Sequence, residues 1–211
     1  MMDHWNSIYS NTSLNSLGWY QEEPQPDLDI ITSLELPKQS KIVIAGAGST
    51  TLLDHLLFQG YYNIVVIDIS SIALKSLNDR ISPIPGSDHV TFLTDDLTQL
   101  KISPEITDCD LWIDRAVLHF FTTPQEQASY QLLIHEIQPK YLLLAQFSTS
   151  GAKKCSGLDV IQYDRPKLDH FAGDIYESIQ ILDFLYINPS GGQRPYIYGL
   201  YQLQNTKFPT K

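Results

Sequence analysis

Residues 41–52 read KIVIAGAGSTTL. The run from Lys41 to Ala45 is apolar and rich in β-branched side chains, which predicts a buried strand. Gly46 and Gly48 then indicate a tight turn, and the following leucines at helical spacing predict a helix that ends at Gly60. The stretch therefore predicts a strand, a glycine turn and a helix in succession.

The same alternation continues along the chain. Ile64 to Ile67 predicts a second buried strand that ends at Asp68, and Ser70 is placed to cap a helix that stops before Pro83. Further predicted elements are strands at Val90–Leu93, Cys109–Ile113 and Tyr141–Phe147, and a helix from about Pro124 to Ile137. Buried strands that alternate with helices indicate a mostly parallel sheet.

After Phe147 the pattern changes to a polar loop (148–156), a short helix (166–171) and two strand-like runs (175–187 and 195–203). The runs are joined by Asn188-Pro-Ser-Gly-Gly192, a turn signal that predicts an antiparallel hairpin. We therefore expect an α/β, Rossmann-like three-layer sandwich with a mostly parallel sheet.

The N-terminal residues 1–26 mix aromatic residues with turn formers and predict an arm or lid. Asp27 to Leu34 predicts a short amphipathic helix, with Asp27 as its cap. We expect one domain over 1–211, with the arm, a cofactor-binding core at 41–147 and a C-terminal part at 148–204.

Composition narrows the function classes. The chain has 211 residues, a net charge of −10 and a pI near 4.8, so it lacks the cationic surface that nucleic-acid binding requires. Two cysteines, Cys109 and Cys155, form no ligand group and indicate a reducing, cytoplasmic location without a metal site. No apolar segment is long enough to span a membrane, and the N-terminus lacks a signal pattern.

A nucleoside site is indicated by Gly46-Ala47-Gly48 together with Asp68. A carboxylate at the end of the second strand can accept hydrogen bonds from both ribose hydroxyls, and small residues allow close approach of a ligand. Thr51 occupies the position where a dinucleotide fingerprint carries Gly or Ala, and no P-loop lysine follows. A nucleoside cofactor without a pyrophosphate, such as S-adenosylmethionine, fits better than NAD or FAD.

Three segments resemble class I S-adenosylmethionine-dependent methyltransferases: IAGAGSTTL (44–52), DIS (68–70) and DLWIDRAVLHFF (110–121). The last of these is similar to a subgroup of small methyltransferase-domain proteins with a DLWxDRAVxHF segment. The resemblance extends over about residues 4–203. It implies seven strands, the last antiparallel, with S-adenosyl-L-methionine as cofactor and S-adenosyl-L-homocysteine as product.

The resemblance also implies roles by position. Gly46, Ala47 and Gly48 lie under the methionine and ribose, Asp68 holds the ribose hydroxyls and Ile69 packs on the adenine. Asp96 and Leu97 recognise the adenine amine, Asp114 borders the methionine and the methyl group, and Trp5, Tyr9, Trp19 and Tyr20 close over the site. Many members carry an acid where this chain has Ile44, so the contact to the methionine ammonium must come from elsewhere, with Asp114 or backbone carbonyls as substitutes.

Candidate catalytic residues lie at the end of the fourth strand. Asp114 and His119 are titratable there and can serve as the base, and Arg115 can bind a substrate carboxylate or orient Asp114. Each has a structural alternative: Asp114 and Arg115 as an ion pair, and His119 as a packing residue.

The acceptor remains open. We expect a small-molecule acceptor, with protein lysine methylation or a cofactor-binding module without catalysis as alternatives. A nicotinamide-dependent oxidoreductase is disfavoured by Thr51 and by the lack of a downstream Tyr-x-x-x-Lys pair. Nucleic-acid and membrane partners are not expected.

Overall fold

The computed structural model describes residues 1–204 and contains a sheet of seven strands in the order β3-β2-β1-β4-β5-β9-β8. The parallel strands are β1 (Ile42–Ala45), β2 (Ile64–Asp68), β3 (Thr91–Thr94), β4 (Leu111–Arg115) and β5 (Tyr141–Phe147). β9 (Gln193–Leu203) is antiparallel to β5 and to β8 (Tyr176–Ile187), which confirms the predicted sheet and hairpin. The part of the predicted domain at 205–211 lies outside the described residues.

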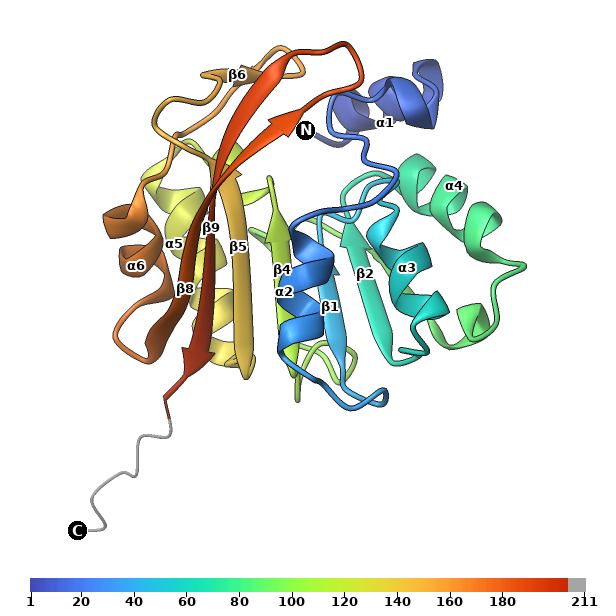
Figure 1. The fold of residues 1–211 in the computed structure, drawn as a ribbon, viewed down its shortest axis with the longest axis horizontal. Coiled ribbons are helices and arrows are strands. Elements are labelled where there is room, and N and C mark those ends of the chain that lie inside the picture. The colour runs from blue at the N-terminus through green and yellow to red at the C-terminus, as the bar shows by residue number, and fades with distance from the viewer. Residues whose placement is uncertain (205–211) are drawn as a thin grey trace, which may run out of the picture.

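Helices cover both faces of the sheet (Figure 1). One face packs against α2 (Asp27–Ser33), α3 (Leu52–Phe58) and α4 (Ser71–Ile81). The other packs against α5 (Pro124–Ile137) and α6 (Arg165–Ala172). Residues of β1 alternate between the two cores because successive strand side chains point to opposite faces: Ile42 and Ile44 join one, Val43 and Ala45 the other.

Local signals account for several helix boundaries. Ser70 accepts a hydrogen bond from the Ala73 N–H at the start of α4, as predicted. Thr123 and Glu126 form a reciprocal capping box that starts α5. Asp27 does not cap α2, contrary to expectation: the residue before the helix is Pro26, and the Asp27 carboxylate is fully buried.

All the remaining elements except η2 (Ser87–His89), which directly precedes β3, lie around the carboxyl ends of the parallel strands (Figure 1). The arm contains α1 (Met2–Asn11) and the 3₁₀ turn η1 (Leu14–Ser16), and α1 lies at the same end of the sheet as the β8–β9 hairpin tip (Figure 1). Within the predicted polar loop, β6 (Lys154–Cys155) pairs with β7 (Leu158–Asp159), a two-stranded sheet too short to give a sequence signal. Two more 3₁₀ turns are η2 (Ser87–His89) and η3 (Leu118–Phe120).

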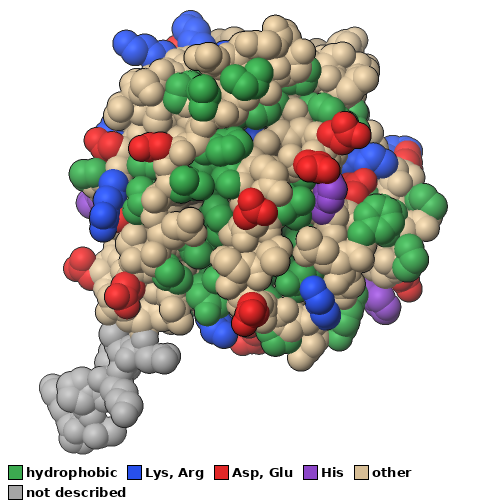
Figure 2. All heavy atoms as spheres, in the orientation of Figure 1, with side chains coloured by type: hydrophobic (Ala, Val, Ile, Leu, Met, Phe, Trp, Pro, Cys, Tyr) green, Lys and Arg blue, Asp and Glu red, His purple; other side chains and the backbone are tan. Residues whose placement is uncertain are grey.

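The surface carries charged side chains of both signs (Figure 2). On the face drawn in Figure 2, acidic and basic side chains are interspersed with polar and apolar ones. Among residues 1–204, no helix combines the length and apolar character that crossing a bilayer demands. The described residues also contain no group of three His, Cys, Asp or Glu side chains placed to hold a metal ion.

Candidate active site

A cavity opens where β1, β2, β3 and β4 end, and the arm and the β9 end of the hairpin complete its wall. We call it the main cavity. Nine of the predicted site residues line it: Trp5, Tyr9, Trp19, Gly46, Asp68, Ile69, Asp96, Leu97 and Arg115. Tyr20 and Ala47 line a neighbouring cavity, whereas Gly48, Asp114 and His119 line neither.

Asp68 is fixed in place by the backbone of the glycine loop and of its own strand end. Its Oδ2 accepts a hydrogen bond from the Gly48 N–H (2.7 Å), and its Oδ1 accepts one from the Ser70 N–H (2.7 Å). Burial raises the pKa of Asp68 to about 6, although the two N–H donors act in the opposite direction. A carboxylate has about four lone-pair sites, so each oxygen of Asp68 can still accept a further hydrogen bond from a ligand.

Both loop glycines have conformations and surroundings that exclude a side chain. The φ values of Gly46 and Gly48 are +61° and +51°, which L-amino acids with a Cβ rarely adopt. A Cβ on Gly46 would lie 2.0 Å from Val117 Cγ2, and one on Gly48 would lie 2.2 Å from the Tyr9 hydroxyl. The loop is therefore closely packed against both the residues after β4 and the arm.

The arm reaches the main cavity through a cluster of aromatic rings. Trp5 packs edge-on against Trp19 and Phe120, with centroids 5.8 and 5.1 Å apart, and Tyr9 packs against Trp19 at 5.9 Å. The Ser70 hydroxyl donates to Asn6 Oδ1 (2.7 Å) and ties α1 to the start of α4. The arm thus lies over the glycine loop, and Trp5, Tyr9 and Trp19 line the main cavity.

Asp96 anchors the loop after β3. Its Oδ1 accepts hydrogen bonds from the Thr98 N–H (2.9 Å) and hydroxyl (2.7 Å), whereas its Oδ2 accepts only a long one from Gln99 Nε2 (3.4 Å). Leu97 is buried beside it. Both positions are compatible with the predicted contact to an adenine.

Asp114 is oriented away from the main cavity. Its carboxylate is fully buried and accepts hydrogen bonds from the Val117 N–H (3.0 Å), the Leu118 N–H (3.1 Å) and Gln146 Nε2 (2.7 Å). Burial raises its pKa, and these donors lower it. The structure therefore gives Asp114 the role of holding the backbone turn after β4, not the predicted place beside a cofactor.

Arg115 pairs with Asp27 instead of Asp114. Strand β4 continues through Arg115, two residues beyond the predicted end, so Asp114 and Arg115 point to opposite faces of the sheet. Arg115 Nε lies 3.5 Å from Asp27 Oδ2 and donates to the Tyr198 hydroxyl (3.3 Å). The guanidinium also packs over the rings of Tyr186 and Tyr196.

His119 is sealed in the core. Its ring stacks on Phe147 with centroids 4.6 Å apart, and neither ring nitrogen has a partner among the described residues. Burial lowers the pKa of His119 to about 3. Its position fits the packing alternative better than the role of a base.

Acidic residues outnumber basic ones in the lining of the main cavity. The acidic lining residues Asp68, Asp95, Asp96 and Glu126 come from the ends of β2 and β3 and from the start of α5. Arg115 is the one basic residue among the described residues that line the cavity, and Cys155 and Tyr196 line it as well. Glu126 and Tyr196 were not predicted from the sequence, because they reach the site only through packing of α5 and β9.

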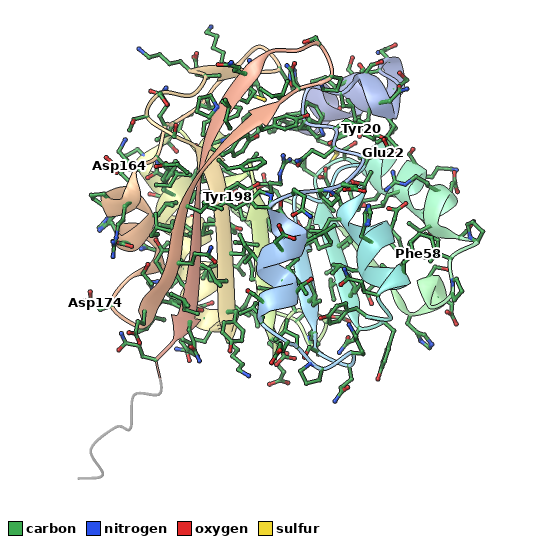
Figure 3. The ribbon with its side chains drawn as sticks, viewed as in Figure 1. Tyr20, Glu22, Phe58, Asp164, Asp174 and Tyr198 are labelled. Carbon is green, nitrogen blue, oxygen red and sulfur yellow. The ribbon has the colours of Figure 1, made fainter. Side chains whose placement is uncertain are left out.

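A smaller cavity, which we call the arm-side cavity, lies between the glycine loop and residues 14–27. It shares Trp19, Gly46 and Arg115 with the main cavity, so the two adjoin at these residues. Asp27 and Ile44 also line it. Figure 3 shows Tyr198 beside the upper end of α2, where Asp27 begins the helix.

Known structures share the fold of this chain. A chain solved in a study of the conversion of a disulfide bond into a thioacetal group during echinomycin biosynthesis superposes with a TM-score of 0.76 and 16% identity, covering 98% of this chain and 94% of that one. A SAM-dependent methyltransferase from Anabaena variabilis gives a TM-score of 0.73 at 13% identity, with 96% and 93% covered. The chain has the class I methyltransferase fold.

Sequence comparisons point the same way. The mouse eEF1A lysine and N-terminal methyltransferase is 28% identical over 129 residues, which are 60% of this chain and 17% of that protein. The chain spans about a fifth of the length of the curated relatives it matches. No protein-family model matches the chain.

The contact between Gly48 and Tyr9 gives a first prediction. In Gly48→Ala, the new Cβ must push the Tyr9 ring away, and Ala at φ +51° adds strain of about 1 kcal/mol. We expect the arm to detach from the loop, with a red shift of tryptophan fluorescence as Trp5 and Trp19 become exposed. Gly18→Ala is the matched control within the arm, because a Cβ there meets nothing within 4 Å. An unshifted spectrum in Gly48→Ala would contradict the closed arm.

Proposed function

We propose that the chain is an S-adenosylmethionine-dependent methyltransferase with a small-molecule acceptor. One observation carries the proposal: the main cavity gathers Gly46, Asp68 and Asp96 from the ends of three adjacent parallel strands beneath the aromatic arm. In a doubly wound sheet, this edge is where a nucleoside is recognised.

The residues present fit the cofactor. Asp68 is held by two backbone N–H groups and keeps lone pairs for a ribose diol. Ile69 and Leu97 offer apolar contacts for an adenine, and Asp96 Oδ2 offers an acceptor for its amine. Gly46 provides a backbone surface without a side chain at the point where both cavities meet.

When bound, S-adenosylmethionine supplies an electrophilic methyl group on a sulfonium. The contribution of the chain is to orient the two reactants in line and to exclude water. Asp68 fixes the ribose, and the rings of Trp5, Trp19 and Phe120 shield the cavity from solvent.

Three polar residues that line the main cavity are poorly suited to act as a base. Burial raises the pKa values of Cys155 and Tyr196, so both hold their protons at neutral pH. The Glu126 carboxylate accepts hydrogen bonds from the Thr123 N–H and hydroxyl at the start of α5. Asp114 and His119 do not line the cavity. We therefore propose an acceptor atom that is nucleophilic without a protein base, such as a thiolate, a thioether or a neutral amine.

Two observations bear on the size of the acceptor. The aromatic lining of the main cavity and the neighbour from echinomycin biosynthesis favour a small molecule. The eEF1A lysine and N-terminal methyltransferases among the relatives favour a protein acceptor as the second candidate. Incubation of cell extract with methyl-labelled cofactor separates them, because the label enters either the small-molecule fraction or a protein band.

Isothermal titration with S-adenosylmethionine and S-adenosylhomocysteine tests the cofactor. We expect micromolar binding and a loss of about 100-fold in Asp68→Ala, since two charge-assisted hydrogen bonds to the ribose disappear. Asp183→Ala is the matched control, because this carboxylate of β8 is exposed and lines neither cavity. Absence of binding to the wild type would overturn the assignment, and binding without turnover of any acceptor would favour the non-catalytic module.

A further inference from the structure

Two opposite charges lie in the arm-side cavity with one atom each left unused. Asp27 is fully buried, and its Oδ2 accepts a hydrogen bond from the Tyr198 hydroxyl (3.1 Å) and faces Arg115 Nε (3.5 Å). Asp27 Oδ1 is buried and has no hydrogen-bond partner among the described residues. Arg115 Nη2 is likewise buried and has no hydrogen-bond partner among the described residues.

Burial of two charged groups with unpaired polar atoms is unfavourable in free energy unless a ligand supplies the missing hydrogen bonds. A buried charged group without its hydrogen bonds loses solvation that nothing replaces, and structures rarely leave such atoms unpaired. Asp27 Oδ2 faces Arg115 Nε, and each of these two atoms also forms a hydrogen bond with the Tyr198 hydroxyl. The free acceptor and the free donor therefore remain for a ligand.

The two free atoms specify the chemistry of that ligand. It must donate to Asp27 Oδ1 and accept from Arg115 Nη2, and because both of these partners are charged, a cationic donor and an anionic acceptor give the strongest hydrogen bonds. A carboxylate alone would face the Asp27 carboxylate, and an ammonium alone would face the guanidinium. An α-amino-acid group, with its ammonium and carboxylate on one carbon, satisfies both.

We propose that Asp27 and Arg115 together bind the α-ammonium and the α-carboxylate of an amino-acid group in the arm-side cavity. The source is either the methionine end of the cofactor or an amino-acid acceptor. The first is favoured because the cavity adjoins the main cavity at Gly46, beside the loop to which Asp68 is bonded. This part of the inference rests on the proposed function.

The assignment also accounts for Ile44. Ile44 stands where many related enzymes carry an acid, and it lines the same cavity as Asp27. α2 packs on the face of the sheet to which Ile44 points, so it can deliver a carboxylate to that place from 17 residues upstream. Asp27 would thus replace the missing acid from a different element.

The primary test removes chemical groups from the ligand and measures binding to the wild-type protein, so that no variant has to fold. S-adenosylhomocysteine is compared with its analogues lacking the α-amine or the carboxylate, and with 5′-methylthioadenosine, which lacks the whole amino-acid end. We expect each single deletion to weaken binding at least tenfold and 5′-methylthioadenosine to bind at least 100-fold more weakly than S-adenosylhomocysteine. Equal affinities for all four ligands would overturn the cofactor as the source.

Variants then assign the residue. Asp27→Asn is expected to weaken S-adenosylhomocysteine at least tenfold and 5′-methylthioadenosine less than twofold. Asp29→Asn, an exposed change on the same helix, is the matched control and should alter neither. Equal weakening of both ligands by Asp27→Asn would show a merely structural role and overturn the proposal.

Free L-methionine distinguishes the two sources. If an amino-acid acceptor occupies the arm-side cavity, L-methionine or another amino acid binds protein saturated with S-adenosylhomocysteine, and Asp27→Asn abolishes that binding. If the wild type binds no adenosyl ligand, the proposed function fails, but amino-acid binding that depends on Asp27 still supports the proposed role of Asp27 and Arg115. If the wild type binds neither adenosyl ligands nor amino acids, that role is overturned as well.

Discussion

Asp114→Ala is expected to lower the free energy of unfolding by about 3 kcal/mol or more, a large fraction of the stability of a typical domain. The Asp114 carboxylate accepts hydrogen bonds from Gln146 Nε2 and from the N–H groups of Val117 and Leu118. The substitution leaves these donors without an acceptor in the interior and opens a cavity beside them. Urea denaturation at neutral pH measures the change.

The control for this experiment is Asp183→Ala, an exposed residue of β8 that should change stability by less than about 0.5 kcal/mol. A loss below 1 kcal/mol in Asp114→Ala, together with lost cofactor affinity, would instead place this carboxylate at the ligand, as the sequence had suggested. The outcome decides between a structural and a catalytic role for the residue.

His119→Phe is expected to make the protein markedly more resistant to acid. The folded-state pKa of His119 is about 3, below the usual 6.5, so the unfolded state takes up this proton first as the pH falls. The wild type therefore loses stability from pH 6.5 downward, by about 3 kcal/mol at pH 4 from this residue alone. Phe removes the titration and keeps a ring to stack on Phe147.

Thermal unfolding of both proteins at pH 7 and pH 4 measures this effect. Other groups titrate equally in both, so the difference between the two pH dependences isolates His119. Asp68 acts in the opposite sense, since its pKa is raised to about 6 and its protonation favours the folded state as the pH falls below that value. Parallel pH profiles for the two proteins would mean that water reaches the His119 ring.

Much of the fold could be predicted because its signals are local. The apolar run at Ile64–Ile67 and the helix start at Ser70 appear in the structure within a residue of their predicted places. Tyr141–Phe147 and Pro124–Ile137 match the predicted bounds. Each depends on hydrophobic periodicity, proline or a capping residue, which act over a few positions.

The end of β4 shows how a small error misplaces a site. The strand was predicted to end at Ile113, which left Asp114 and Arg115 as neighbours in a loop, free to pair. In the structure the strand runs through Arg115, and its alternation sends the two side chains to opposite faces. Element boundaries are weakly encoded, because several successive end points cost almost the same free energy.

The sequence by itself determined the succession of the main strands and helices along the chain, the glycine turn and the acid at the end of β2. Local periodicity and turn chemistry specify each of these features. Only the tertiary structure decided that Asp27 meets Arg115, that Tyr196 and Glu126 reach the main cavity, and that His119 is sealed from it. These contacts join residues distant in the chain. They depend on how the helices, the arm and the terminal hairpin pack on the sheet, which no short-range pattern records.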